Sequence, residues 1–166
     1  MRFCEDNAVT PFVRQLIKTM FDRGANLKVL RNIKIEVPSD LMALDEVLLQ
    51  FNQIDRNFIS VRDWLQCRLA LAEGFTNAVR HAHKNLPRDT PIRIEVFLNQ
   101  TTMKIQIWDY GPAFNLHNFI AERVKENADW LASGRGIPII NKISDRLDYY
   151  RTEQQQNCLL IVKKFV

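Results

Sequence analysis

Three polar side chains of different chemistry recur at steps of four residues near the middle of the chain. Glu73, Asn77 and His81 fall within residues 69–84, which read LALAEGFTNAVRHAHK. Residues four apart lie on the same side of an α-helix, because the helix has 3.6 residues per turn. The spacing therefore predicts a carboxylate, an amide and an imidazole in a row along one side of a helix.

These groups suit a bound magnesium–triphosphate. An amide oxygen such as that of Asn77 is a neutral ligand for Mg²⁺, which otherwise keeps waters and takes phosphate oxygens. The carboxylate of Glu73 can accept a proton from a hydroxyl or orient a water. Arg80, His81 and Lys84 on the following turn suit developing negative charge, so the pattern indicates phosphoryl transfer. The alternative for this stripe is an ordinary solvated helix face.

Gly74 is a second unusual feature of the same stretch. A glycine inside a helix costs about 1 kcal/mol relative to alanine, so its place beside Glu73 requires a reason, such as close approach of a ligand. The opposite side of the helix is expected to pack on a sheet through its apolar members Trp64, Leu71, Phe75, Ala78 and Ala82.

Two later segments could complete a nucleotide site. The predicted strand in MKIQIWDYGP ends at Asp109, whose carboxylate can accept the exocyclic amino group of adenine, and Gly111 lets a base approach the backbone. The segment SGRGIPII, residues 133–140, places two glycines before a predicted helix, where free N–H groups attract anions. The alternative for the first segment is a plain turn, and the alternative for the second is a loop hinge or a simple N-cap. Neither segment is a P-loop or a dinucleotide-binding GxGxxG motif.

The remaining pattern predicts the elements that must position these groups. We expect helices at about 11–20, 41–52, 61–86, 116–130 and 137–144, and strands at about 32–37, 91–98, 102–109, 146–151 and 158–166. No repeat or linker interrupts the chain. The order predicts a single α+β domain with helices on one face of a mixed or antiparallel sheet.

Composition excludes several classes of protein. Apolar residues make up 46% and charged residues 25%, as in soluble globular domains. The three cysteines form no CxxC pair, which argues against a disulfide framework or a zinc site. No stretch approaches the length of a membrane span, and MRFCEDNAVT lacks the apolar run of a signal peptide, so we expect a cytoplasmic protein with no membrane partner. The net charge of +4 is scattered, and direct nucleic-acid binding is not expected.

Three segments together resemble the nucleotide-binding motifs of the gyrase, heat-shock chaperone, histidine kinase and MutL ATPase superfamily. They are ExxxNAxxHA at 73–82, WDYGPAFN at 108–115 and SGRGIPII at 133–140. Within that superfamily the chain looks most like the bacterial anti-sigma factor serine/threonine kinases of partner-switching systems. The resemblance covers about residues 33–166. It implies a two-layer α/β sandwich with the histidine-kinase-like ATPase (Bergerat) fold, and the cofactors ATP and Mg²⁺.

The resemblance also assigns roles to individual residues. Glu73 would be the catalytic base, Asn77 the Mg²⁺ ligand and Asp109 the adenine acceptor. The remaining positions expected at the ATP site are His81, Gly111, Ala113, Gly134, Arg135, Gly136 and Ile137. Ala113 departs from the wider superfamily, which prefers glycine there; the anti-sigma kinases often relax this position.

The resemblance implies a serine/threonine protein kinase that uses Mg-ATP, binds a sigma factor or other regulatory protein, and phosphorylates a small antagonist. A non-catalytic, ATP-gated binding module is the alternative. A histidine kinase fragment fits less well, because its phospho-acceptor hairpin needs more than the thirty residues upstream. We divide the chain into a helical extension, 1–30, and an ATP-binding domain, 31–166. Residues 11–20 carry an apolar stripe that could pack on this domain or form a homodimer contact.

Overall fold

The computed structural model describes residues 31–125 and 135–165. Its five strands form one sheet in the order β1-β2-β3-β5-β4, in which every neighbouring pair is antiparallel. The strands are β1 (Arg31–Pro38), β2 (Pro91–Leu98), β3 (Thr102–Asp109), β4 (Arg146–Arg151) and β5 (Asn157–Lys164). The expected strands are therefore confirmed, and the sheet is antiparallel rather than mixed.

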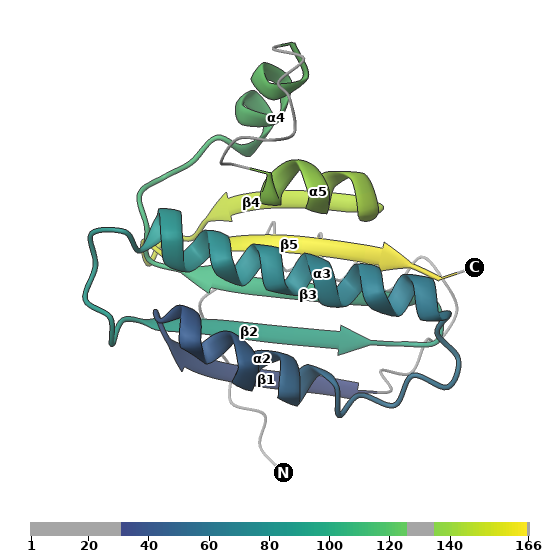
Figure 1. Ribbon diagram of the computed structural model, residues 1–166. Helices are drawn as coiled ribbons and strands as arrows, with labels where there is room; N and C mark the ends of the chain where they lie inside the picture. The colour runs from purple at the N-terminus through teal and green to yellow at the C-terminus, as the bar shows by residue number, and fades with distance from the viewer. Residues whose placement is uncertain (1–30, 126–134, 166) are drawn as a thin grey trace.

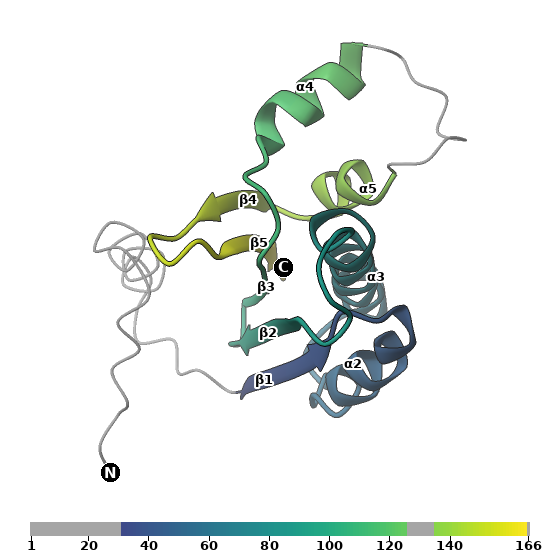
Figure 2. The same cartoon turned by 90° about the vertical axis from the view of Figure 1, so that its left-hand side faces the viewer.

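The helices at residues 44–51, 61–77 and 136–143 lie on one face of this sheet, and the helix at 116–125 extends beyond its β4 edge (Figures 1 and 2). A 3-10 turn (Leu41–Ala43) leads into α2 (Leu44–Phe51), and α3 (Val61–Asn77) runs into a π-helical turn, η2 (Ala78–Ala82). Two more helices, α4 (Leu116–Lys125) and α5 (Gly136–Ile143), follow β3. The two-layer arrangement confirms the predicted α+β sandwich.

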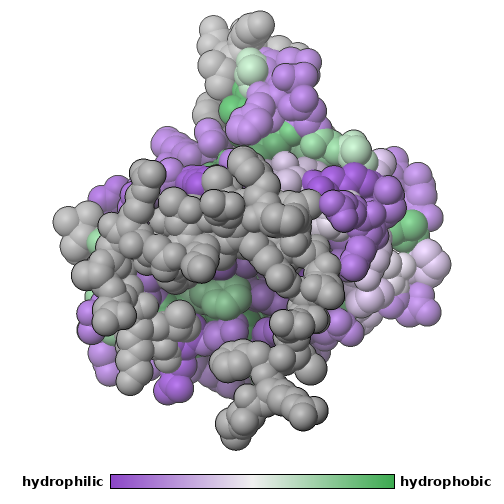
Figure 3. Space-filling model, turned by 180° about the vertical axis from the view of Figure 1, so that it is seen from behind, coloured by the Kyte–Doolittle hydropathy of each residue, from purple (hydrophilic) through white to green (hydrophobic). Residues whose placement is uncertain are grey.

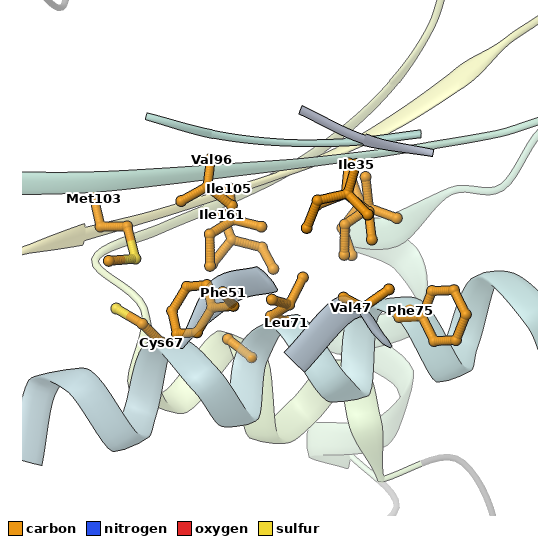
Figure 4. Packing of buried hydrophobic residues seen from close by; sticks show 14 of the residues in the cluster. Ile35, Val47, Phe51, Cys67, Leu71, Phe75, Val96, Met103, Ile105 and Ile161 are labelled. Atoms are coloured by element: carbon orange, nitrogen blue, oxygen red, sulfur yellow. The ribbon is translucent and has the colours of Figure 1, made fainter. Parts of the chain in front are cut away.

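Alternation along the strands explains the two layers. In β2 the buried residues Ile92, Ile94 and Val96 alternate with the half-buried Arg93 and Glu95, so one face of the strand is apolar. The apolar face packs on α3, where Leu71 and Phe75 are fully buried (Figure 4). The visible coloured surface on the opposite side of the molecule is mostly hydrophilic (Figure 3).

Ser60 determines where α3 begins. Its side chain accepts a hydrogen bond from the N–H of Asp63 at 3.0 Å, as an N-cap does. The helix then crosses the middle of the sheet, between α2 and α5 (Figure 1).

The end of this helix differs from the prediction. We expected it to continue to about Leu86, but regular helix ends at Asn77 and a π-helical turn follows to Ala82. There the N–H of His83 bonds the carbonyl of Ala78 at 2.8 Å, and the His83 side chain turns toward the end of β3. A contact between distant segments therefore overrides the local helical pattern.

The predicted helix at 11–20 and the end of the predicted 116–130 helix lie outside the described residues.

Candidate functional site

The packing of α3 on the sheet gives a further reason for the glycine at position 74. A Cβ atom at Gly74 would lie 2.5 Å from Cδ1 of Ile107 and 3.3 Å from Cδ2 of Leu159. The glycine therefore lets the helix approach the side chains of β3 and β5 closely. Gly74 also borders the cavity described below, together with Ile107 and Leu159, so the close approach to the sheet and the space of the cavity both favour a glycine here.

Glu73 and Asn77 converge on the first residue of α5. A Cβ atom at Gly136 would lie 2.8 Å from Oε2 of Glu73 and 2.7 Å from Nδ2 of Asn77. Both polar side chains are half-buried, and this amide nitrogen has no hydrogen-bond partner among the described residues. The absence of a side chain at Gly136 therefore brings a helix start directly against a carboxylate and an amide.

Asp109 is fixed at the end of β3 by three donors. Its Oδ1 accepts from the N–H of Gly111 at 2.8 Å and from Nδ2 of Asn157 at 2.7 Å, and its Oδ2 accepts from the hydroxyl of Tyr149 at 3.0 Å. The side chain is only 3% exposed. A buried carboxylate is tolerated when it is hydrogen-bonded in this way, and the donors fix its direction.

Gly111 connects this strand end to the end of the π-helical turn η2. A Cβ atom there would lie 2.7 Å from the Cα, Cβ and carbonyl oxygen of Ala82, which leaves no space for any larger residue. The carbonyl of Gly111 accepts from Nδ2 of Asn157 and from Nη1 of Arg151, both at 2.9 Å. Asp109 and the loop after it are therefore held by β4, β5 and the π-helical turn together.

These elements enclose a cavity of about 360 Å³, within the usual range for ligand pockets. α3 and the turn η2 contribute its polar side with Asn77 and His81, β3 contributes Asp109, and α5 contributes Ile137. The segment after β3 contributes Pro112, Ala113 and Phe114. The cavity is mainly apolar with a few polar groups directed into it, which suits a flat heterocyclic base with a polar edge.

The structure thus places most of the predicted site residues together. Asn77, His81, Asp109, Ala113 and Ile137 line the cavity. Glu73, Gly111 and Gly136 contact lining residues or lie beside them, and Arg135 is exposed immediately before α5. Gly134 lies outside the described residues.

Magnesium and a triphosphate fit the residues present. The amide nitrogen of Asn77, unpaired within the described part of the chain, can donate to a phosphate oxygen, while its carbonyl oxygen is the atom that would ligate Mg²⁺, and the Glu73 carboxylate faces the same point at the start of α5. No cluster of three or more acidic, histidine or cysteine side chains occurs among the described residues, so protein groups alone do not form a full metal cage there. One amide ligand, with phosphate and water supplying the other positions, is an arrangement that Mg²⁺ accepts.

Sequence reasoning missed four residues that hold Asp109 and the loop after it: Tyr149, Arg151, Asn157 and His83. The first three lie on the C-terminal strands, about 40 residues or more from Asp109. The pairing of Asp109 with Asn157 across β3 and β5 brings them there. His83 could have been singled out from the sequence, since it directly follows the ExxxNAxxHA motif.

The profile of the histidine kinase-like ATPase domain matches residues 37–163, well over half of the chain. The chain belongs to the histidine kinase-like ATPase family. None of the curated proteins matches it. Membership of this family shows the Bergerat-type fold and indicates that this cavity binds ATP.

In this histidine kinase-like ATPase domain, no helix of the described residues is long and apolar enough to span a membrane.

His83 links the stability of the site to pH. Its ring is buried, and Nε2 accepts from the N–H of Tyr110 at 2.8 Å, so the other ring nitrogen carries the hydrogen in the neutral form. Burial lowers the pKa of His83, and the nearby charge of Asp109 opposes this only in part. Below about pH 6.5 the unfolded chain therefore binds more protons than the folded protein.

We expect the free energy of unfolding to fall as the pH decreases below about 6.5, since His83 must remain neutral in the fold. His83→Gln should have a lower free energy of unfolding at pH 7.5 and a weaker dependence on pH. Urea unfolding at pH 7.5 and 5.5 measures both. The exposed His117 gives the control, because His117→Gln should leave the pH dependence as in the wild type. An unchanged slope in His83→Gln would contradict this role.

Proposed function

We propose that this protein is an ATP-dependent anti-sigma regulatory factor with serine/threonine kinase activity, which phosphorylates a small antagonist protein in a partner-switching pathway. The observation that carries the proposal is the convergence of Glu73 and Asn77 on Gly136, next to the cavity. A base, a metal ligand and a helix N-terminus meet there, and phosphoryl transfer depends on positioning such groups around phosphate oxygens. The sigma factor and the antagonist follow from the resemblance of the three motifs alone.

Each side chain has a defined role in this proposal. Asp109 accepts the exocyclic amino group of adenine, and Asn77 contributes an amide oxygen to Mg²⁺. The metal neutralises charge on the phosphate oxygens when it is bound. Glu73 removes the proton from a serine or threonine hydroxyl of the antagonist as that oxygen attacks the γ-phosphorus and ADP leaves. The start of α5, including Arg135, lies toward the phosphates, where its N–H groups favour negative charge.

A non-catalytic, ATP-gated binding module is the second candidate, and the same contact favours it. Because Gly136 touches Glu73 and Asn77, a metal ion or phosphate held by these side chains alters what the start of α5 contacts. If α5 has two arrangements, a ligand that binds one of them more tightly increases its population. The affinity for a partner that contacts α5 then changes as well. Transfer of label from ATP to a protein distinguishes the kinase from this module.

We expect Glu73→Gln to bind ATP about as tightly as the wild type but to transfer phosphate about 10²- to 10⁴-fold more slowly, since it removes only the base. Labelled ATP, incubated with candidate antagonist proteins, measures transfer, and calorimetry measures binding. The exposed Glu46 on α2 offers a matched control, because Glu46→Gln makes the same change away from the cavity. Transfer at the wild-type rate in Glu73→Gln would remove Glu73 from the mechanism.

We expect Asn77→Ala to weaken ATP binding in the presence of magnesium but to have little effect in EDTA, because the amide oxygen acts through the metal. Calorimetric titration of ATP with either Mg²⁺ or EDTA measures the two affinities. Equal weakening in both buffers would show that Asn77 contacts the nucleotide directly or serves only the packing of α5.

A further inference from the structure

Tyr149 is well placed to form a hydrogen bond with the base of a bound nucleotide, although no sequence motif includes it. It lies on β4, lines the cavity and is half-buried. Its hydroxyl donates to Oδ2 of Asp109 at 3.0 Å. Its ring meets that of Phe114 edge-on, with centroids 5.7 Å apart. The hydroxyl is therefore held beside the carboxylate at the polar end of an apolar cavity.

The hydrogen bonds of Asp109 leave only one of its oxygens open to a ligand. Oδ1 already accepts from Gly111 and Asn157, which fills its two lone-pair directions. Among residues 31–125 and 135–165, Oδ2 accepts from Tyr149 alone, so it retains one direction for another donor. A base amino group that donates to Oδ2 is thereby brought next to the Tyr149 hydroxyl.

Resting on the ATP-binding function proposed above, we propose that Tyr149 determines base specificity by donating a hydrogen bond to N1 of adenine while Asp109 accepts from the 6-amino group. The adenine edge presents a donor and an acceptor side by side, and the Asp109–Tyr149 pair presents an acceptor and a donor 3.0 Å apart. A guanine in the same orientation directs a carbonyl oxygen at the carboxylate, so two acceptors meet.

The exchange leaves Oδ2 of Asp109 and the hydroxyl hydrogen of Tyr149 each with a partner. In the free protein the single hydroxyl hydrogen of Tyr149 is used on Asp109. In the complex the hydroxyl turns to N1, and the 6-amino group replaces it at Oδ2. Burial and the charge of Asp109 raise the pKa of Tyr149, so the hydroxyl keeps its hydrogen at ordinary pH.

The test compares ATP with 1-deaza-ATP, in which a C–H group replaces N1. The wild type should bind ATP about tenfold more tightly than 1-deaza-ATP, the usual effect of one buried hydrogen bond. Tyr149→Phe keeps the ring beside Phe114 but loses the donor, so its affinities for the two nucleotides should agree within about twofold. Calorimetry measures all four affinities, and thermal unfolding verifies that the variant is folded.

Tyr150 supplies the matched control. It is the next residue on β4 but faces the other side of the sheet, where its hydroxyl accepts from Nε2 of Gln106 at 3.2 Å and its ring meets Trp108 edge-on. Tyr150→Phe should keep the tenfold preference for ATP.

Three results would overturn the proposal: no preference in the wild type, a preference retained in Tyr149→Phe, or a preference lost equally in Tyr150→Phe. If neither nucleotide binds the wild type, the proposed function fails, and this proposal fails with it. If the wild type binds both nucleotides equally tightly, only the role of Tyr149 is refuted, and the proposed ATP binding stands.

Discussion

The site depends on a buried carboxylate that has one direction left for a ligand. Asp109 ends the central strand β3, and its buried carboxyl oxygens are hydrogen-bonded there because Gly111, Asn157 and Tyr149 donate to them. Those donors come from the adjoining loop and from β5 and β4, so the whole C-terminal half of the sheet must be paired before the carboxylate is fixed. In the function proposed above, the direction of this one side chain decides which base edge the cavity accepts.

Two glycines allow the loop after β3 and the helix α5 to approach the remaining elements of the site. Gly111 allows the loop after β3 to touch Ala82, and Gly136 allows α5 to touch Glu73 and Asn77. A methyl group at either position would occupy space already filled by neighbouring atoms. The loop after β3 therefore contacts the turn η2, and α5 contacts α3, so that both segments border the same cavity.

Much of this could be predicted from the sequence, because the signals were local. Alternation predicted the strands, helical spacing placed Glu73 and Asn77 in a row, and glycines marked both loops. What could not be predicted depends on contacts between distant segments. The end of α3 is determined by His83 reaching β3, and the role of Tyr149 depends on the pairing of β4 with β5. The sequence indicated that Gly74 needs a reason, such as a ligand nearby, but it could not reveal that the Ile107 side chain of β3 lies opposite it.

Calorimetric titration of Mg-ATP into the wild type and Asp109→Asn tests whether the buried carboxylate holds the nucleotide. We expect saturable binding to the wild type. We expect the variant to bind about 10- to 100-fold more weakly, because an amide is a poorer acceptor and adds a competing donor at a charged hydrogen bond. Circular dichroism verifies that the variant is folded. No binding to folded wild-type protein, or equal affinity in the folded variant, would contradict the assignment of this cavity as the nucleotide site.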